Sequence, residues 1–234
     1  YTSLEEAVKA STSIDEIILT DDAELVYTIT NPYAPAKTIN ASVIDLNGKT
    51  MTIKDTDLRF NNTTIKNGKI VVAPGSYGGT AIFFQFNDLA FNDVEITATG
   101  LAGTYLIGLE GNSNLNLYDS QIIIDNENLV NLTAAVACNG SGSTIVENSN
   151  IYVKNINGRA FLNTSCSVVN SVVTADYVKA GFRIPANKTL SIDANSTVTI
   201  TNLVGGNVNG IDLHGNAIYN VEDGATVNAT VGRN

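Results

Sequence analysis

The chain has 234 residues and a formal net charge of −10, with 44% hydrophobic and only 15% charged residues. So acidic a chain is a poor partner for nucleic acid, because phosphate binding requires clustered lysine and arginine side chains. No run of residues approaches the ~18 apolar residues that a membrane-spanning helix needs, so we expect no membrane insertion of this segment. The hydrophobic content is sufficient for one continuous core.

The first predicted element is an amphipathic helix over residues 3–10, SLEEAVKA. Ser3 is the expected N-cap, and Glu6, three residues later, completes a capping box. We expect this helix to cover the first coil of a stacked structure formed by residues 14–231, because an open end exposes unpaired strand edges. No equivalent cap follows residue 231. The uninterrupted repeat predicts a single domain over residues 1–234. We expect this domain to be a fragment of a longer surface protein; the alternative is that another component closes its C-terminal end.

A repeat dominates the rest of the chain. Between residues 89 and 231 a motif of apolar strand, polar turn and apolar strand recurs six times, about 22 to 29 residues apart. The segments are LAFNDVEITA (89–98), LNLYDSQIII (115–124), TIVENSNIYV (144–153), CSVVNSVVTA (166–175), LSIDANSTVTI (190–200) and YNVEDGATVNA (219–229). Apolar residues two apart on both sides of a turn are typical of β-strands, whose side chains alternate between two faces. Each segment is therefore predicted to be two strands joined by a tight corner.

Equivalent apolar positions of the segments form predicted inward columns, which begin with Leu89, Phe91 and Ile96. A third strand precedes each segment: AIFFQF (81–86), YLIGLE (105–110), AAVACN (134–139), RAFLNT (159–164), GFRIPA (181–186) and GIDLHG (210–215). A unit of three strands cannot bury its own apolar face, so units must stack, with each strand parallel to its equivalent ~4.8 Å away. The prediction is an all-β, single-stranded parallel β-helix with three sheets and about eight or nine coils.

The variable coil length favours a right-handed helix, because a left-handed hexapeptide helix needs a strict six-residue period. At this point the chain resembles the right-handed parallel β-helix proteins of the pectin-lyase-like superfamily and adhesin-like surface proteins. Residues 38–73 look like the opening coils of that superfamily. The resemblance extends over nearly the whole chain, and it implies an architecture rather than an activity.

Asparagine, aspartate and glycine fill the predicted turns, where they tolerate left-handed backbone conformations. We expect asparagine side chains of adjacent coils to hydrogen-bond along the stack as an asparagine ladder. Cys138 and Cys166 fall at inward positions on different strands of neighbouring coils. We expect buried free thiols that act as small apolar fillers, and a disulfide is the alternative if the two Cα atoms lie within ~7 Å.

The resemblance also implies an enzymatic alternative, because the superfamily includes polysaccharide lyases and glycoside hydrolases. Such lyases typically use an arginine or lysine as base, with carboxylates that hold calcium against an acidic sugar. Arg183 in GFRIP, and Asp212 and His214 in GIDLHG, occupy outward positions on equivalent strands of successive coils. Glu110 and Asn163 are expected on the same face. This set is a starting point for acid–base chemistry, although the polygalacturonase order of NTD, paired aspartates, GHG and RIK is not matched.

Binding without catalysis is the other expectation. Glycans are the expected ligand, because exposed tyrosine, asparagine and aspartate supply stacking faces and hydrogen bonds. Tyr118 and Tyr152, at outward strand positions, and Asn163 are the candidate contacts. The turn acids Asp93 and Asp119 each offer one oxygen ligand, whereas calcium takes six to eight. No metal site and no cofactor is therefore predicted, with calcium left open.

Together these features predict a non-catalytic secreted or cell-surface module, adhesin-like, that binds a glycan or another host or cell-surface ligand, or acts as a stalk. The alternative is a polysaccharide lyase or glycoside hydrolase that acts on acidic polysaccharide through Arg183, Asp212 and His214. A third class, a binder of ice or crystal surfaces, needs a flat array of Thr-X-Thr over several coils. The chain shows only scattered instances of that pattern, such as residues 197–199.

Overall fold

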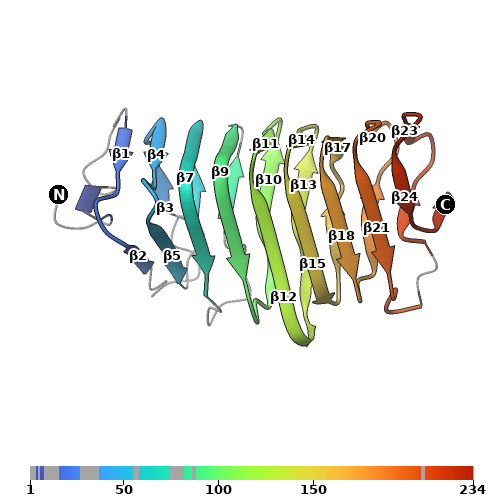
Figure 1. Cartoon of the computed structure of the whole chain (residues 1–234), viewed down its shortest axis with the longest axis horizontal. Coiled ribbons are helices and arrows are strands. Elements are labelled where there is room, and N and C mark those ends of the chain that lie inside the picture. Colours follow the sequence, from blue (N-terminus) through green and yellow to red (C-terminus); the bar gives the residue numbers. More distant parts are fainter. Residues whose placement is uncertain are drawn as a thin grey trace.

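The computed structural model describes residues 4, 6–7, 16–26, 37–54, 58–73, 82–85, 88–206 and 209–233. Over this range the chain is an elongated stack of β-strands that advances from the N-terminal to the C-terminal end (Figure 1). The strands pair in parallel, and strands of the same face in successive turns lie side by side. The protein is therefore an all-β parallel β-solenoid, as the repeat predicts.

The strands form three faces. The first two belong to one 16-stranded sheet that bends at a corner, and the third is a separate nine-stranded sheet. β7 (Thr63–Val72) and β9 (Leu89–Ala98) run through the corner and contribute to both of the first two faces.

The remaining strands are assigned to the three faces as follows. The first face also contains β1 (Glu16–Ile18), β4 (Val43–Asp45), β11 (Leu115–Tyr118), β14 (Ser143–Glu147), β17 (Ser165–Val169), β20 (Thr189–Ile192) and β23 (Ile218–Val221). The second face also contains β2 (Ala23–Val26), β5 (Thr50–Lys54), β12 (Gln121–Val130), β15 (Asn150–Ile156), β18 (Val172–Asp176), β21 (Thr197–Thr201) and β24 (Thr226–Asn228). The third face contains β3 (Lys37–Ile39), β6 (Leu58–Phe60), β8 (Ile82–Gln85), β10 (Gly103–Gly111), β13 (Leu132–Gly140), β16 (Arg159–Leu162), β19 (Ala180–Ile184), β22 (Ile211–Leu213) and β25 (Val231–Arg233).

The register of strand pairing confirms the predicted inward columns. Leu115 pairs with Leu89 in the preceding turn and with Thr144 in the next. The columns that begin with Phe91 and Ile96 continue in register through the later turns. Because equivalent positions repeat turn by turn, apolar side chains stack on apolar side chains in one core.

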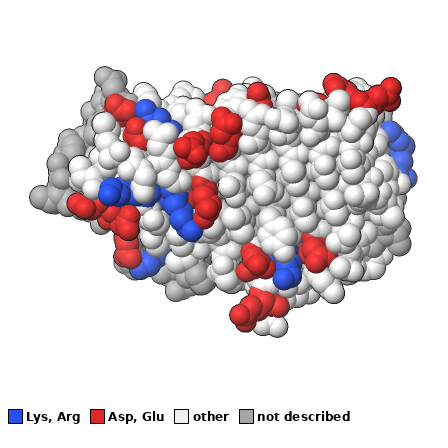
Figure 2. Space-filling view, in the orientation of Figure 1, with Lys and Arg blue, Asp and Glu red and all other residues white. Residues whose placement is uncertain are grey.

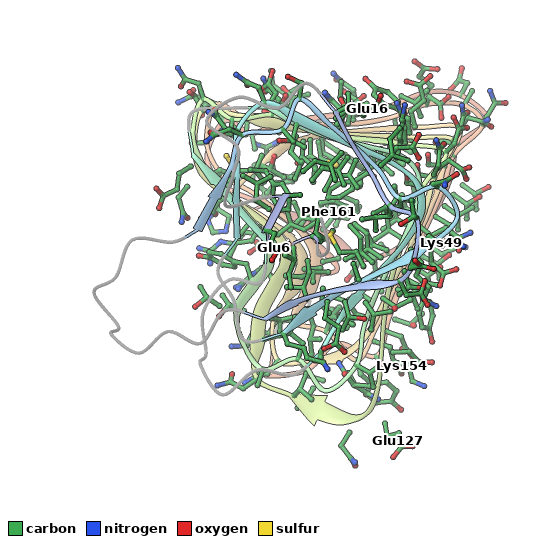
Figure 3. The ribbon with its side chains drawn as sticks, turned by 90° about the vertical axis from the view of Figure 1, so that its left-hand side faces the viewer. Glu6, Glu16, Lys49, Glu127, Lys154 and Phe161 are labelled. Atoms are coloured by element: carbon green, nitrogen blue, oxygen red, sulfur yellow. The ribbon has the colours of Figure 1, made fainter. Side chains whose placement is uncertain are left out.

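Figure 3 looks along the stack and shows this core enclosed by the three faces, with Phe161 inside and Glu16, Lys49 and Lys154 on the outer surface. Phe161 and Phe182 come from successive turns of the third face and are fully buried. Their ring centroids are 4.9 Å apart and their planes differ by 6°, so the two rings are stacked. An aromatic pair of this kind contributes about 0.5–1.5 kcal/mol beyond the burial of its area.

Most of the helix predicted for residues 3–10 lies outside the described residues. Leu4, Glu6 and Ala7 are described and helical. Leu4 and Ala7 are each 5% exposed and belong to the core, whereas Glu6 faces solvent. The helix as a whole, and the right-handed sense of the solenoid, stay predictions.

The corner between the first and second faces requires a left-handed backbone in most turns. Six of its residues have φ between 45° and 59°: Asn47, Asn67, Asp93, Asp119, Asn148 and Asn170. Asparagine and aspartate tolerate this conformation better than other side chains, which is why they recur here in the sequence. The predicted asparagine ladder occurs as contacts between neighbouring turns, such as Asn170 Nδ2 donating to Asn148 Oδ1 at 2.8 Å.

A column of buried serines, which the apolar repeat does not reveal, lies at the same corner. Its members, Ser120, Ser149, Ser171 and Ser196, are at most 5% exposed. Each hydroxyl accepts a hydrogen bond from a backbone N–H of the preceding turn, at 2.9 to 3.1 Å. The first three also donate to the carbonyl oxygen two residues earlier, at 2.6 to 2.7 Å. The column therefore satisfies backbone groups that the tight corner would otherwise bury without partners.

Cys138 and Cys166 are both buried free thiols, as expected from their inward positions. Burial raises the pKa of the Cys166 thiol. A thiol held in its neutral form behaves as a small apolar side chain.

Candidate functional site

An open groove follows the corner between the first and second faces over four successive turns. Its cavity volume is about 590 Å³, within the ~300–1,000 Å³ usual for small-molecule sites. The lining residues are Asn47, Gly48, Asn67, Gly68, Asp93, Val94, Glu95, Asp119 and Gln121. Amides and carboxylates predominate, so the groove offers hydrogen-bond donors and acceptors rather than an apolar wall.

The acids of the groove differ in their surroundings. Glu95 forms an ion pair with Lys69, with 2.7 Å between the charged atoms. Asp93 and Asp119 are exposed residues at the same corner position of adjacent turns. Because paired strands are ~4.8 Å apart, these two carboxylates lie on neighbouring levels of the groove. The repeat makes the corner acids visible in the sequence, but the groove itself appears only when four turns are stacked.

Asp45 holds two of the asparagines that line the groove. Asn67 Nδ2 donates to Asp45 Oδ1 at 3.1 Å, and the backbone N–H of Asn47 donates to the same oxygen at 2.8 Å. Lys66 Nζ lies 3.3 Å from Asp45 Oδ2. Burial acts to raise the pKa of Asp45, but the bonds from Asn47, Asn67 and Lys66 outweigh it, and the pKa lies below its ordinary value. The asparagines are thus anchored to a carboxylate that stays ionised.

Three residues predicted as an enzymatic group come together on the third face. Arg183 on β19 pairs in register with Asp212 on β22. Oδ2 of Asp212 lies 3.0 Å from Nε2 of His214, and both side chains are partly buried. Glu110, on β10, is four strands away from β22 in the sheet, or about 19 Å at the usual strand spacing. Glu110 therefore does not reach the other three residues.

A second arginine, Arg159 on β16, belongs to this group. It is partly buried, and its Nε is a buried donor with no hydrogen-bond partner among the described residues. Desolvation lowers the pKa of Arg159, the charge of Arg183 lowers it further, and Asp212 acts in the opposite direction. These charges are therefore within electrostatic reach of one another. The alignment of the strand segments does not reveal that Arg159 and Arg183 interact, because Arg159 is the first residue of RAFLNT and Arg183 is the third residue of GFRIPA.

The predicted glycan contacts lie on separate parts of the surface. Tyr118 is on β11 of the first face, and Tyr152 is on β15 of the second. Asn163 follows β16 with a φ of 58°, and its N–H donates to the carbonyl oxygen of Arg183. The three residues do not form one site, and the role of each in binding stays a prediction.

Charged residues are unevenly distributed over the surface. Figure 2 shows lysines and acids gathered over the N-terminal turns, whereas the face over β15, β18 and β21 is largely uncharged apart from a small group at its lower edge. Ion pairs account for much of this pattern: Lys54–Glu24, Lys66–Glu16, Lys69–Glu95 and Lys154–Asp125. Exposed pairs contribute little to stability, about 0–1 kcal/mol each.

The described residues hold neither a cluster of metal ligands nor a membrane-spanning helix. Within those ranges, no three side chains of His, Cys, Asp or Glu gather closely enough to hold a metal ion. The same part of the molecule contains no helix with the length and hydrophobicity of a bilayer span.

Fold and site together define a parallel β-solenoid with a polar corner groove and a partly buried arginine group on its third face. No protein-family model matches the chain, and no curated protein or solved structure matches it either.

Proposed function

We propose that the protein is a non-catalytic β-solenoid module of a secreted or cell-surface protein, adhesin-like in its role, that binds glycans through the corner groove. The groove carries the proposal, because it combines a volume suited to a ligand with a polar lining repeated over four turns. Sugar hydroxyls both donate and accept hydrogen bonds, so amide and carboxylate side chains are suitable partners. The parallel solenoid also supports a place among the right-handed β-helices of the pectin-lyase-like superfamily.

The way the groove is built supports a binding role. Its corner residues are held by backbone bonds between turns, such as Gly48 N–H to Asn67 O at 2.7 Å. A lining that is already ordered loses little conformational entropy when a ligand arrives. Repetition along the stack also suits a ligand that is itself a chain of similar units.

Binding is tested with a glycan array followed by calorimetric titration of the strongest ligand. The variant Asp93→Asn, Asp119→Asn removes two charges while keeping residues that tolerate the left-handed corner. We expect it to bind at least tenfold more weakly than the wild type. Asp223→Asn, at an exposed C-terminal turn outside the groove, is the matched control and should bind normally. Equal binding by all three proteins would refute the groove as the site.

The alternative function, a polysaccharide lyase or glycoside hydrolase acting on acidic polysaccharide, is favoured by the convergence of Arg183, Asp212 and His214. It is tested by assaying unsaturated products and new reducing ends, with and without calcium. Cleavage that Arg183→Ala or His214→Ala abolishes would establish an enzyme and overturn the non-catalytic proposal. If neither binding nor cleavage is detected, the remaining function is that of a rigid spacer.

A further inference from the structure

The third face presents a local excess of positive charge in an otherwise acidic protein. Arg159 and Arg183 lie on adjacent strands, and Asp212 is the carboxylate whose charge acts on Arg159. On the other faces several lysines form ion pairs with acids, as in Lys69–Glu95 and Lys154–Asp125. In a chain of net charge −10, two arginines placed close enough to repel each other are an exception that calls for a compensating anion.

The unsatisfied hydrogen-bond donor of Arg159 also indicates an anion-binding site. Its Nε is buried and has no hydrogen-bond partner among the described residues. Buried polar groups almost always have partners, and a charged donor left without one is costly. Because the guanidinium is fixed in charge and carries a planar fork of N–H donors, an oxyanion is the partner that fits it best.

A small buried apolar cluster lies on the same face as the arginines. Ala134, Ala137 and Leu162 form a small cluster separate from the main core, and the partly buried Tyr105 packs against it. In the strand register Tyr105 pairs with Ala134, and Ala134 pairs with Arg159. Tyr105 is therefore two strands, or about 10 Å, from Arg159. A tyrosine ring at this distance from an anion-binding fork suits an extended organic anion that contains a ring.

We propose that Arg159 and Arg183 bind the carboxylate or sulfate group of an acidic saccharide, whose ring packs against Tyr105. The site is on the third face, with Tyr105 on β10 and the arginines on β16 and β19, whereas the groove lies at the corner of the other sheet over residues 47–121. It does not depend on the proposed function of that groove. A saccharide or a free inorganic anion can supply the oxyanion, and the experiment separates these two sources.

The test is calorimetric titration of the intact chain with a sulfated heparin oligosaccharide, an oligogalacturonate and inorganic sulfate. We expect at least one saccharide to bind, with affinity falling as salt is raised, and with at least a tenfold loss for Arg159→Gln and for Arg183→Gln. Lys154→Gln, which removes a positive charge from the second face, should bind as the wild type does. The groove variant Asp93→Asn, Asp119→Asn should also keep this affinity, which separates the two proposals.

Two further variants guard against loss of the fold. Arg159→Lys keeps the charge but loses the planar fork, and Tyr105→Ala removes the ring; each should weaken saccharide binding while the circular dichroism spectrum is unchanged. Binding of sulfate alone, abolished by the arginine variants, would keep the oxyanion site and identify a free anion as its ligand. Absence of binding by all three probes, or binding that neither arginine variant weakens, would overturn the proposal.

Discussion

The backbone N–H of Ser120 donates a hydrogen bond of 3.0 Å to the hydroxyl oxygen of Ser149 in the next turn. The Ser149 hydroxyl in turn donates to the carbonyl oxygen of Glu147 at 2.7 Å. One buried side chain thus satisfies backbone groups in two successive turns of the solenoid. The same arrangement recurs at Ser171, so the corner is held by a continuous polar column beside an apolar core.

Replacing Ser149 by alanine should destabilise the fold, because the N–H of Ser120 would stay buried without an acceptor. The expected loss is about 1–3 kcal/mol in the free energy of unfolding, measured by chemical denaturation. Ser167→Ala is the control, since Ser167 lies on the outer side of β17 and is partly exposed; it should change stability by less than about 0.5 kcal/mol. Equal stability of the two variants would show that water replaces the hydroxyl.

Truncation of the stacked phenylalanine pair should be more severe. Phe161→Ala removes a fully buried ring, and such changes cost about 3–5 kcal/mol. Combined with Phe182→Ala in a double-mutant cycle, it should give a coupling energy of about 0.5–1.5 kcal/mol, attributable to ring stacking. Additive effects of the two changes would contradict a specific contact between the rings.

Asp45 should make the free energy of unfolding depend on pH. Its pKa in the folded protein lies below the ordinary value of 3.8, so folding favours the ionised carboxylate. The stability that its hydrogen bonds contribute is present above about pH 4 and is lost as the pH falls through the lower folded pKa. The difference in unfolding free energy between wild type and Asp45→Asn, measured in urea, should therefore shrink between pH 6 and pH 3. A difference independent of pH in this window would count against the assigned hydrogen bonds.

The two thiols should be inert in the native protein. Cys138 and Cys166 are at most 3% exposed, and burial raises the pKa of Cys166, which disfavours the reactive thiolate. We expect Ellman's reagent to label neither thiol under native conditions and both in denaturant. Ser167→Cys, on the outer side of β17, provides a positive control with one rapidly labelled thiol. Rapid labelling of the wild type would indicate that the core opens readily.

The columns that begin with Leu89, Phe91 and Ile96 were predictable, because stacking forces the same apolar spacing on every turn and therefore leaves a period in the sequence. The third-face strands were predictable for the same reason. Ser149 was not, because a polar residue at a tight corner looks like an exposed turn residue until its partners in adjacent turns are seen. The alignment places Tyr105, Ala134 and Arg159 at the same position of successive third-face strands, but it does not show that the Nε of Arg159 is buried without a partner among the described residues.

The groove, too, could not be predicted from the sequence. Asp93 and Asp119 were visible as corner acids, but a hollow surface depends on side chains from four turns together. Arg183, Asp212 and His214 were correctly placed on one face by strand alternation alone. Their distance from Glu110 could be obtained only from the number of strands between them.

Within the described stack, each turn pairs only with its immediate neighbours. The stability of such a stack is approximately the sum of the stabilities of its turns and of the interfaces between adjacent turns. A substitution in one turn therefore affects mainly the stability of that turn and of the two adjacent turns. Its effect decreases with distance along the axis of the stack. The corner groove and the third-face arginines occupy different turns, so substitutions in one should add to substitutions in the other. Two surfaces on one rod can therefore change their ligands independently, while the interior that supports them both stays the same.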